Sequence, residues 1–130
     1  MCSARWTVRA DSLRSVLDNY EVLCGVWSEA QSSQLDREMR ARIIGVDTQM
    51  HTFDFLFGIS LGNLLLCHTD NLSKTLQHKS LSAAEGQRLA KLTLQVLQSL
   101  RNEDHFKSYY ARVLYDQACF QVDVPTLPRK

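Results

Sequence analysis

The residues that could carry out hydrolytic chemistry lie in the middle of the chain. His51 and Asp54 are three positions apart, and Ser60 and Ser73 follow them. A hydrolase of this kind needs a nucleophile, a base and an orienting acid in contact, with the serine on a sharp turn between glycines. Neither that turn nor a glycine-rich phosphate loop surrounds these residues in the sequence. We therefore expect no enzymatic activity from this chain.

A second set of side chains could bind a metal ion. It comprises Cys2, Cys67, His68, Asp70 and His105. Structural zinc sites use four ligands that come in closely spaced pairs, and this set has no such pairing. We expect no metal and no cofactor, with Cys67 acting as a small apolar core residue and His68 lying on a helix surface.

The overall charge is nearly balanced. The 130 residues include 15 Lys and Arg against 14 Asp and Glu, a formal charge of +1. Such a chain has no strong field that would attract nucleic acid or an acidic membrane surface. Any contact with DNA must therefore be local. The length is that of one domain, which buries roughly two-thirds of the surface its unfolded chain exposes.

The cysteines and the apolar stretches bear on cellular location. The four cysteines are far apart and form no C-x-x-C pair, which is typical of reduced thiols in the nucleus or cytosol. The opening MCSARWTVRAD has no apolar stretch, so we expect no signal peptide. The most apolar window, 55–67, is shorter than the roughly 20 residues of a membrane-spanning helix. We expect no membrane partner and no small-molecule substrate.

Apolar periodicity predicts about five helices. The first runs from Asp11 to about Ala30, and the second begins at Asp36, a good N-cap. Within 36–77 we expect a break between Phe57 and Gly62, because a glycine costs about 1 kcal/mol relative to alanine in a helix. A kink or new cap is plausible at 68–71. The central stripe of this stretch consists of Met39, Ile43, Val46, Met50, Phe53, Phe57, Leu61 and Leu64.

The last two helices have clear start signals. Ser82 and Glu85 have the spacing of a capping box, in which each side chain satisfies a backbone N–H of the other residue. Asn102 can cap the fifth helix. The sequence therefore predicts an all-α domain of about five helices in an antiparallel, bundle-like arrangement. The predicted core contains Trp27, Met50, Phe53, Phe57, Leu92, Val96 and Phe106.

The domain organisation follows from the same pattern. Residues 1–9 form an irregular arm, 10–120 the helical domain, and 121–130 a linker-like tail with two prolines.

Two segments and a dipeptide resemble a known family. The segments are HTDNLSKTLQ (68–77) and SLSAAEGQRLAKLTLQVLQSLRNEDHF (80–106), and the dipeptide is Arg5-Trp6 within Ala4-Arg5-Trp6-Thr7. Together they resemble the helical insertion of hAT-family transposases, especially their domesticated zinc finger MYM-type relatives. The likeness covers essentially the whole chain and extends to the tail 127–130. One departure is Ala4, where the family usually has threonine.

The resemblance implies a role for Arg5 and Trp6. In active family members the tryptophan of this motif stacks on a flipped base at the transposon end, and an adjacent guanidinium can hold phosphate. The opposing interpretation, which we favour on the sequence, is that Trp6 packs on the first or second helix. The resemblance also implies that the three catalytic carboxylates of the RNase H-like core lie outside this chain.

Two functional hypotheses follow. The first is a non-catalytic helical segment of an hAT transposase-derived, nuclear protein that scaffolds the catalytic core and contacts DNA through Arg5 and Trp6. The alternative is a helical protein-protein interaction module without a DNA role, which binds a partner or itself. Arg37, Arg40 and Arg42 could position DNA backbone. We favour the interpretation that these arginines are simply solvated and do not contact DNA, because the acidic residues Asp36, Glu38 and Asp47 lie near them and offset their positive charge.

Overall fold

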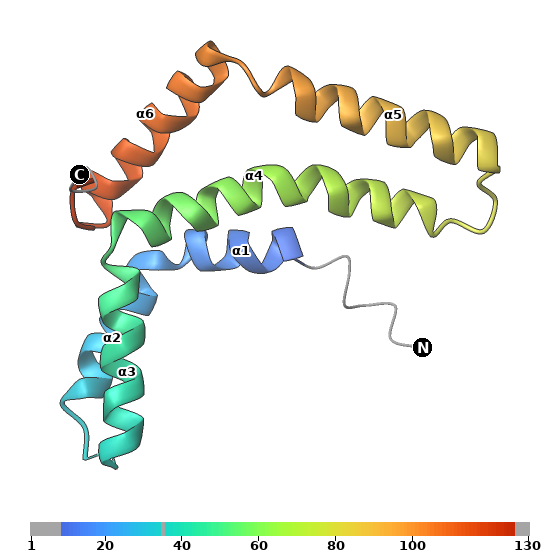
Figure 1. Cartoon of the computed structure of the whole chain (residues 1–130). Coiled ribbons are helices and arrows are strands. Elements are labelled where there is room, and N and C mark those ends of the chain that lie inside the picture. Colours follow the sequence, from blue (N-terminus) through green and yellow to red (C-terminus); the bar gives the residue numbers. More distant parts are fainter. Residues whose placement is uncertain (1–8, 35, 127–130) are drawn as a thin grey trace.

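The computed structural model describes residues 9–34 and 36–126 and contains six helices in that part of the chain (Figure 1). They are α1 (Arg9–Asp18), α2 (Tyr20–Gln31), α3 (Arg37–Met50), α4 (Phe53–Leu76), α5 (Ala83–Ser99) and α6 (Glu103–Cys119). No strand occurs among these residues. The all-α class is confirmed.

The longest helix, α4, organises the others. Helix α1 lies against it in the antiparallel direction, and α5 returns along its C-terminal half (Figure 1). At the α1–α4 contact, a Cβ atom added to Gly62 would lie 3.0 Å from Leu13 Cδ1. Glycine therefore allows these two helices to approach closely.

A buried carboxylate joins the same two helices. Asp70 in α4 is 4% exposed and accepts a hydrogen bond of 2.8 Å from the backbone N–H of Ala10, in the first turn of α1. The N–H groups of a first helical turn have no partner within their own helix. Asp70 thus caps α1 from a position 60 residues away in the sequence.

Helices α2 and α3 form a hairpin that projects from the rest of the molecule (Figure 1). The angle between α3 and α4 is 73°. The bend occurs at His51 and Thr52, where Thr52 is the N-cap of α4 and accepts a bond of 3.3 Å from the N–H of Phe55. The hydroxyl of Tyr20 donates to the carbonyl of Met50 at the base of the hairpin.

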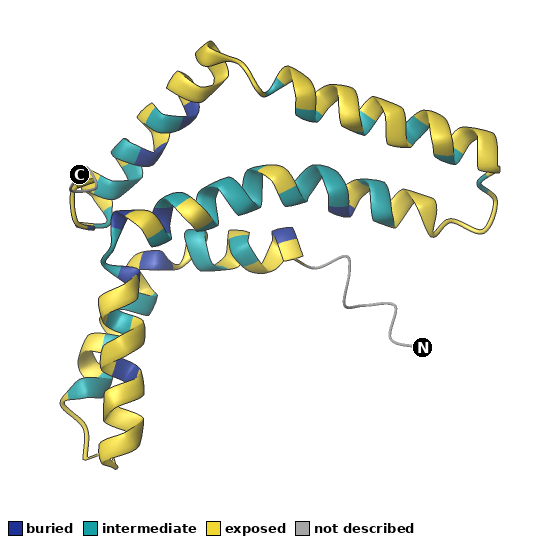
Figure 2. Cartoon of the chain, in the orientation of Figure 1, coloured by how far each residue is buried: buried dark blue, intermediate teal, exposed yellow. Residues whose placement is uncertain are grey.

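The core lies where the bases of α2 and α3 meet the start of α4 and the end of α6 (Figure 2). The chain after α6 completes it, because the Phe120 ring stacks on Tyr20 at 4.8 Å and the N–H of Asp123 donates to the carbonyl of His51 at 2.8 Å. The predicted linker therefore begins by packing onto the domain. The buried cluster is Tyr20, Met50, Phe53, Leu56, Tyr109, Val113 and Val122.

Several predicted helix boundaries are confirmed. Asp36 is the N-cap of α3, Ser82 and Glu85 form the capping box of α5, and Asn102 caps α6 by accepting from the N–H of His105. These signals act within about three residues, so the sequence displays both partners.

Other boundaries were wrong. The helix predicted from Asp11 to Ala30 is divided at Asn19 into α1 and α2, and the break predicted between Phe57 and Gly62 occurs instead at residues 51–52. Helix α4 also continues without interruption through 68–71. Packing against α1 and α6 outweighs the small intrinsic cost of the two glycines and of the polar segment.

The core prediction was correct at the end of α3 and the start of α4 and wrong for α5 and the start of α6. It was also wrong for Met39 and Val46 in the central stripe, which are 49% and 43% exposed. Met50 and Phe53 are buried, while Trp27 and Phe57 are half-buried against the core. The other three predicted core residues are exposed, by 44% for Leu92, 41% for Val96 and 54% for Phe106. Among the described residues, α4 covers this side of α5 only in part.

The substitution Gly58→Ala is expected to stabilise the domain by about 0.5–1 kcal/mol, because alanine restricts the unfolded chain and favours helix. An added Cβ there meets no atom within 4 Å. Chemical denaturation would measure the change. Gly62→Ala is the matched control in the same helix, and its gain should be smaller because Leu13 must move. A loss of stability in Gly58→Ala would contradict this reasoning.

Within residues 9–34 and 36–126, no single helix has both the length and the apolar character needed to cross a membrane. Helices α3 and α4 together meet these two criteria as one bent pair.

Candidate functional site

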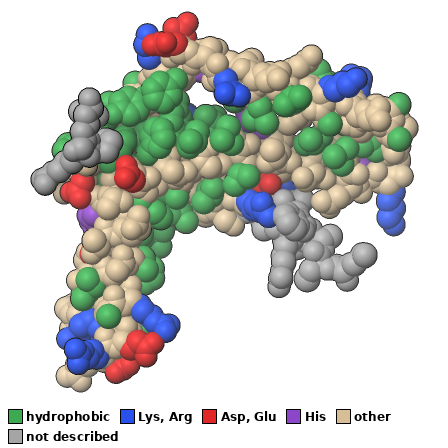
Figure 3. Space-filling model, in the orientation of Figure 1, with side chains coloured by type: hydrophobic (Ala, Val, Ile, Leu, Met, Phe, Trp, Pro, Cys, Tyr) green, Lys and Arg blue, Asp and Glu red, His purple; other side chains and the backbone are tan. Residues whose placement is uncertain are grey.

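An open apolar groove lies between α4, the end of α5 and the first half of α6. Its volume is about 770 Å³. Figure 3 shows hydrophobic side chains gathered over the region where α4 and α6 meet. The apolar lining consists of Leu61, Leu64, Leu65, Leu66, Leu97, Leu100, Phe106 and Tyr109.

The groove exists because α5 and α6 diverge from α4. Helix α5 is amphipathic and begins with a full capping box, yet none of its residues is buried. Leu92 and Val96 line a second hollow of about 230 Å³ further along α4 and α5. Amphipathic helices in globular proteins place their apolar side against other protein. The apolar side of α5 is only partly covered in this way.

The basic side chains of the groove are Arg101, His105 and Arg112. None of the described residues that line the groove carries a carboxylate. Asn102 holds the histidine in place, since its Oδ1 accepts from the His105 N–H at 2.9 Å and its Nδ2 lies 2.7 Å from His105 Nδ1. These two contacts orient the His105 ring at the edge of the groove.

Tyr109 forms a fixed part of the groove wall. Its hydroxyl donates a hydrogen bond of 2.8 Å to the carbonyl of Phe57, and the two rings meet edge to face at 5.3 Å. Burial raises the pKa of Tyr109 to about 12, although the Arg112 guanidinium acts in the opposite direction. The neutral phenol therefore remains a hydrogen-bond donor well above neutral pH and ties α6 to α4.

The residues considered for metal binding do not converge. Cys67 donates its S–H to the carbonyl of Leu64 at 3.0 Å, and Asp70 caps α1. His68 lines the smaller hollow, whereas His105 lies on α6. In the described residues no three potential ligands gather around one point. Cys2 lies outside the described residues.

The residues considered for hydrolysis are also separate. His51 Nδ1 is 2.8 Å from the carbonyl oxygen of Asp47 and 3.6 Å from its carboxylate Oδ1, while Asp54 is exposed. These His51 contacts cap the C-terminal end of α3.

The predicted DNA-contacting residues, Arg5 and Trp6, lie outside the described residues. The arginines of α3 are exposed. Arg42 forms an ion pair of 2.6 Å with Glu38, and Arg40 donates to the carbonyl of Ser33 at 3.2 Å. Both contacts are local to the α2–α3 hairpin.

The groove was not predicted from the sequence, although the sequence contains the apolar pattern that forms it. The apolar stripe of α5 and Phe106 were assigned to a core, which correctly identified an apolar side and incorrectly assumed a covering element. His105, Ser108 and Arg112, which line the groove, are also spaced along one face of α6, and Arg101 lies just before its N-cap. Periodicity reveals such a face without saying what packs on it.

Comparisons with known proteins give no assignment. No family model, no curated protein and no solved structure matches this chain.

Proposed function

We propose that this chain is a non-catalytic helical interaction module, in which the groove between α4, α5 and α6 binds an apolar segment of a partner protein. The observation that supports this most is the incomplete burial of α5, an amphipathic helix without one buried residue. Exposed apolar side chains that lie together, as opposed to singly, commonly mark interaction sites.

A few groove side chains that a partner buries could supply most of the free energy of binding. Full burial of a Leu or Phe side chain contributes about 1.5–3 kcal/mol relative to exposure. Leu65 is still 40% exposed and Phe106 54% exposed, so a substantial part of that contribution is available to a partner. Aromatic residues that enter a desolvated interface commonly dominate its binding energy. Phe106 is the residue placed to do so.

The test uses a matched pair of substitutions in α6. Phe106→Asp should abolish the binding of a partner, whereas Tyr115→Asp should not, because Tyr115 is 70% exposed and does not line the groove. Proteins retained by the purified wild-type domain and by Tyr115→Asp, but not by Phe106→Asp, would be purified and their dissociation constants measured directly. Equal binding by both variants would refute the proposal.

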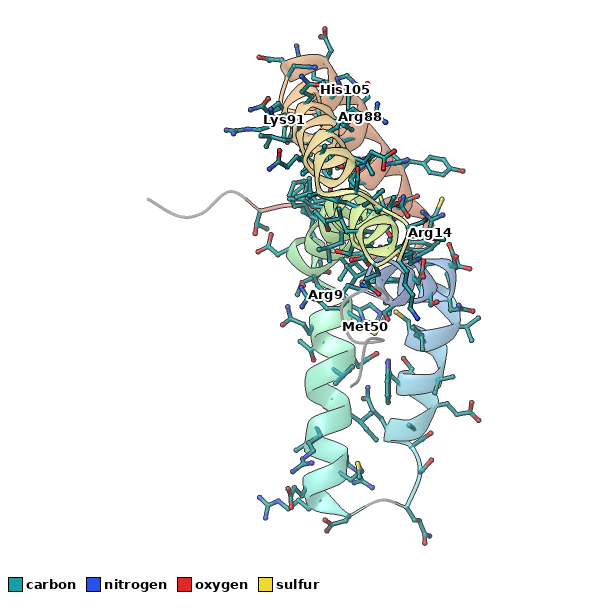
Figure 4. The ribbon with its side chains drawn as sticks, turned by 90° about the vertical axis from the view of Figure 1, so that its right-hand side faces the viewer. Arg9, Arg14, Met50, Arg88, Lys91 and His105 are labelled. Carbon is teal, nitrogen blue, oxygen red and sulfur yellow. The ribbon has the colours of Figure 1, made fainter. Side chains whose placement is uncertain are left out.

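A second proposal retains the resemblance to hAT transposases, with a nuclear location and a local DNA contact. It is supported by the outer side of α5, where Arg88 and Lys91 are exposed (Figure 4) and the one acidic residue, Glu85, is held by Ser82 in the capping box. Such side chains suit phosphate contacts that position a protein without reading sequence. Trp6 would supply the stacking contact, and Arg5 would hold phosphate.

Binding to hairpin DNA in a mobility-shift assay tests this second proposal. Trp6→Ala should weaken binding by about 1–3 kcal/mol if the ring stacks on a base. The pair Arg88→Glu and Lys91→Glu should weaken it and reduce its salt dependence. Unchanged affinity in both variants would rule out a DNA role for these residues.

A further inference from the structure

We infer that the groove accepts an amphipathic helix that carries acidic side chains along one edge. This inference rests on the proposed interaction function and adds the chemical class of the partner.

The backbone of the lining argues for a helical partner. Every wall of the groove is an α-helix or a helix end, whose backbone groups are largely occupied within the helix. An extended peptide would therefore find no free strand edge to pair with and would leave its own N–H and C=O groups unsatisfied against leucine side chains. A helix satisfies its own backbone and presents only side chains.

The shape of the groove argues against a small molecule. Pockets for small ligands enclose most of the ligand surface. Here the side chains at the opening remain exposed, Leu65 by 40% and Phe106 by 54%. The apolar positions also continue along α4 and α5 to the second hollow at Leu92 and Val96. An elongated partner would cover both regions, as one helix laid between two others does.

The basic side chains of the lining favour acidic side chains along one edge of the partner helix. Arg101 and Arg112 are exposed cations, and the exposed His105 lines the same groove. The nearest acidic residues on α6 lie outside the lining: Glu103 pairs with Lys107 at 3.3 Å, Asp104 is exposed at the helix start, and Asp116 is half-buried one turn beyond Arg112. Carboxylates from a partner would thus meet two guanidinium groups.

The test uses designed peptides of about 18 residues, long enough for an apolar stripe at i, i+3, i+4 and i+7. One labelled peptide carries leucines on that stripe and glutamates along one edge, and a second has lysines in place of the glutamates. Fluorescence anisotropy with the wild-type domain should show at least about tenfold tighter binding of the glutamate peptide. The preference should shrink between 0.1 M and 1 M salt, as the Debye length falls from about 10 Å to about 3 Å.

The charge-reversed variant Arg101→Glu with Arg112→Glu should prefer the lysine peptide. The control, Arg88→Glu with Lys91→Glu, changes the net charge equally on the outer side of α5 and should keep the wild-type preference (Figure 4). Circular dichroism would establish that both variants fold, which is expected because all four side chains are exposed.

Three results would overturn the inference: equal affinity for the two peptides, no measurable binding of either, or a preference that does not depend on Arg101 and Arg112. A wild-type dimer in sedimentation that Phe106→Asp dissociates would also overturn it, since a second copy would then be the occupant. If Phe106→Asp loses a partner while the charge preference is absent, the interaction function stands and the acidic helix does not.

Discussion

Replacing Leu56 with alanine is expected to lower the free energy of unfolding by about 2–5 kcal/mol, the cost of removing a large core side chain and leaving a cavity. Leu56 is 0% exposed and belongs to the core cluster at the start of α4. The bases of the hairpin, α4 and α6 meet there, so the surrounding side chains cannot collapse inward without moving a helix. Urea denaturation followed by circular dichroism would measure the loss.

The control for this prediction is Leu94→Ala in α5. Leu94 is 56% exposed, and its truncation should change stability by no more than about 0.5 kcal/mol. Similar losses for the two variants would show that the core is not centred at Leu56.

Replacing Asp70 with alanine is expected to cost about 1–3 kcal/mol, because the N–H of Ala10 is left buried without a partner. The carboxylate is 4% exposed and reaches α1 directly. Besides the loss in denaturation midpoint, α1 should fray from α4, which would appear as faster amide exchange in residues 10–14. Asp70→Asn, whose side-chain oxygen can still accept, should lose less.

The control lies between the same two helices. Lys74 Nζ and Asp11 Oδ2 are 3.5 Å apart, with side chains 50% and 68% exposed. Exposed ion pairs contribute roughly 0–1 kcal/mol. Asp11→Asn should therefore cost clearly less than Asp70→Ala. Equal costs would mean that the buried cap does not hold α1.

Helix caps whose two partners are close in the sequence could be predicted, and a cap whose partners are far apart could not. The caps at Asp36, Ser82 and Asn102 could be predicted because each partner lies within about three residues. The cap that Asp70 provides to Ala10 could not, since it crosses 60 positions. Sequence spacing carried no information about that pairing.

The misplaced break in α4 has an energetic explanation. Each glycine costs about 1 kcal/mol relative to alanine, which is small beside the burial of Phe53 and Leu56 in the same helix. At Gly62 the absent side chain even assists packing, because Leu13 occupies the space. The true bend at residues 51–52 has no glycine or proline. It combines a local cap at Thr52 with the distant bonds Tyr20–Met50 and Asp123–His51.

The error at α5 was of a different kind. Its apolar stripe was identified correctly, but a sequence pattern contains no information on whether the covering surface belongs to the same chain. The candidate site was therefore predicted as core, and its exposure became visible only in three dimensions.

The α2–α3 hairpin touches the remainder of the domain at one end only, through Tyr20, Met50 and the residues around His51 (Figure 1). Among its described residues beyond that base, only Ile43 is buried. The part of the hairpin beyond Tyr20 and Met50 should consequently open as a separate cooperative unit with a low free energy. Its amide protons would exchange with solvent through that local opening, while those near Leu56 would exchange only when the whole domain unfolds.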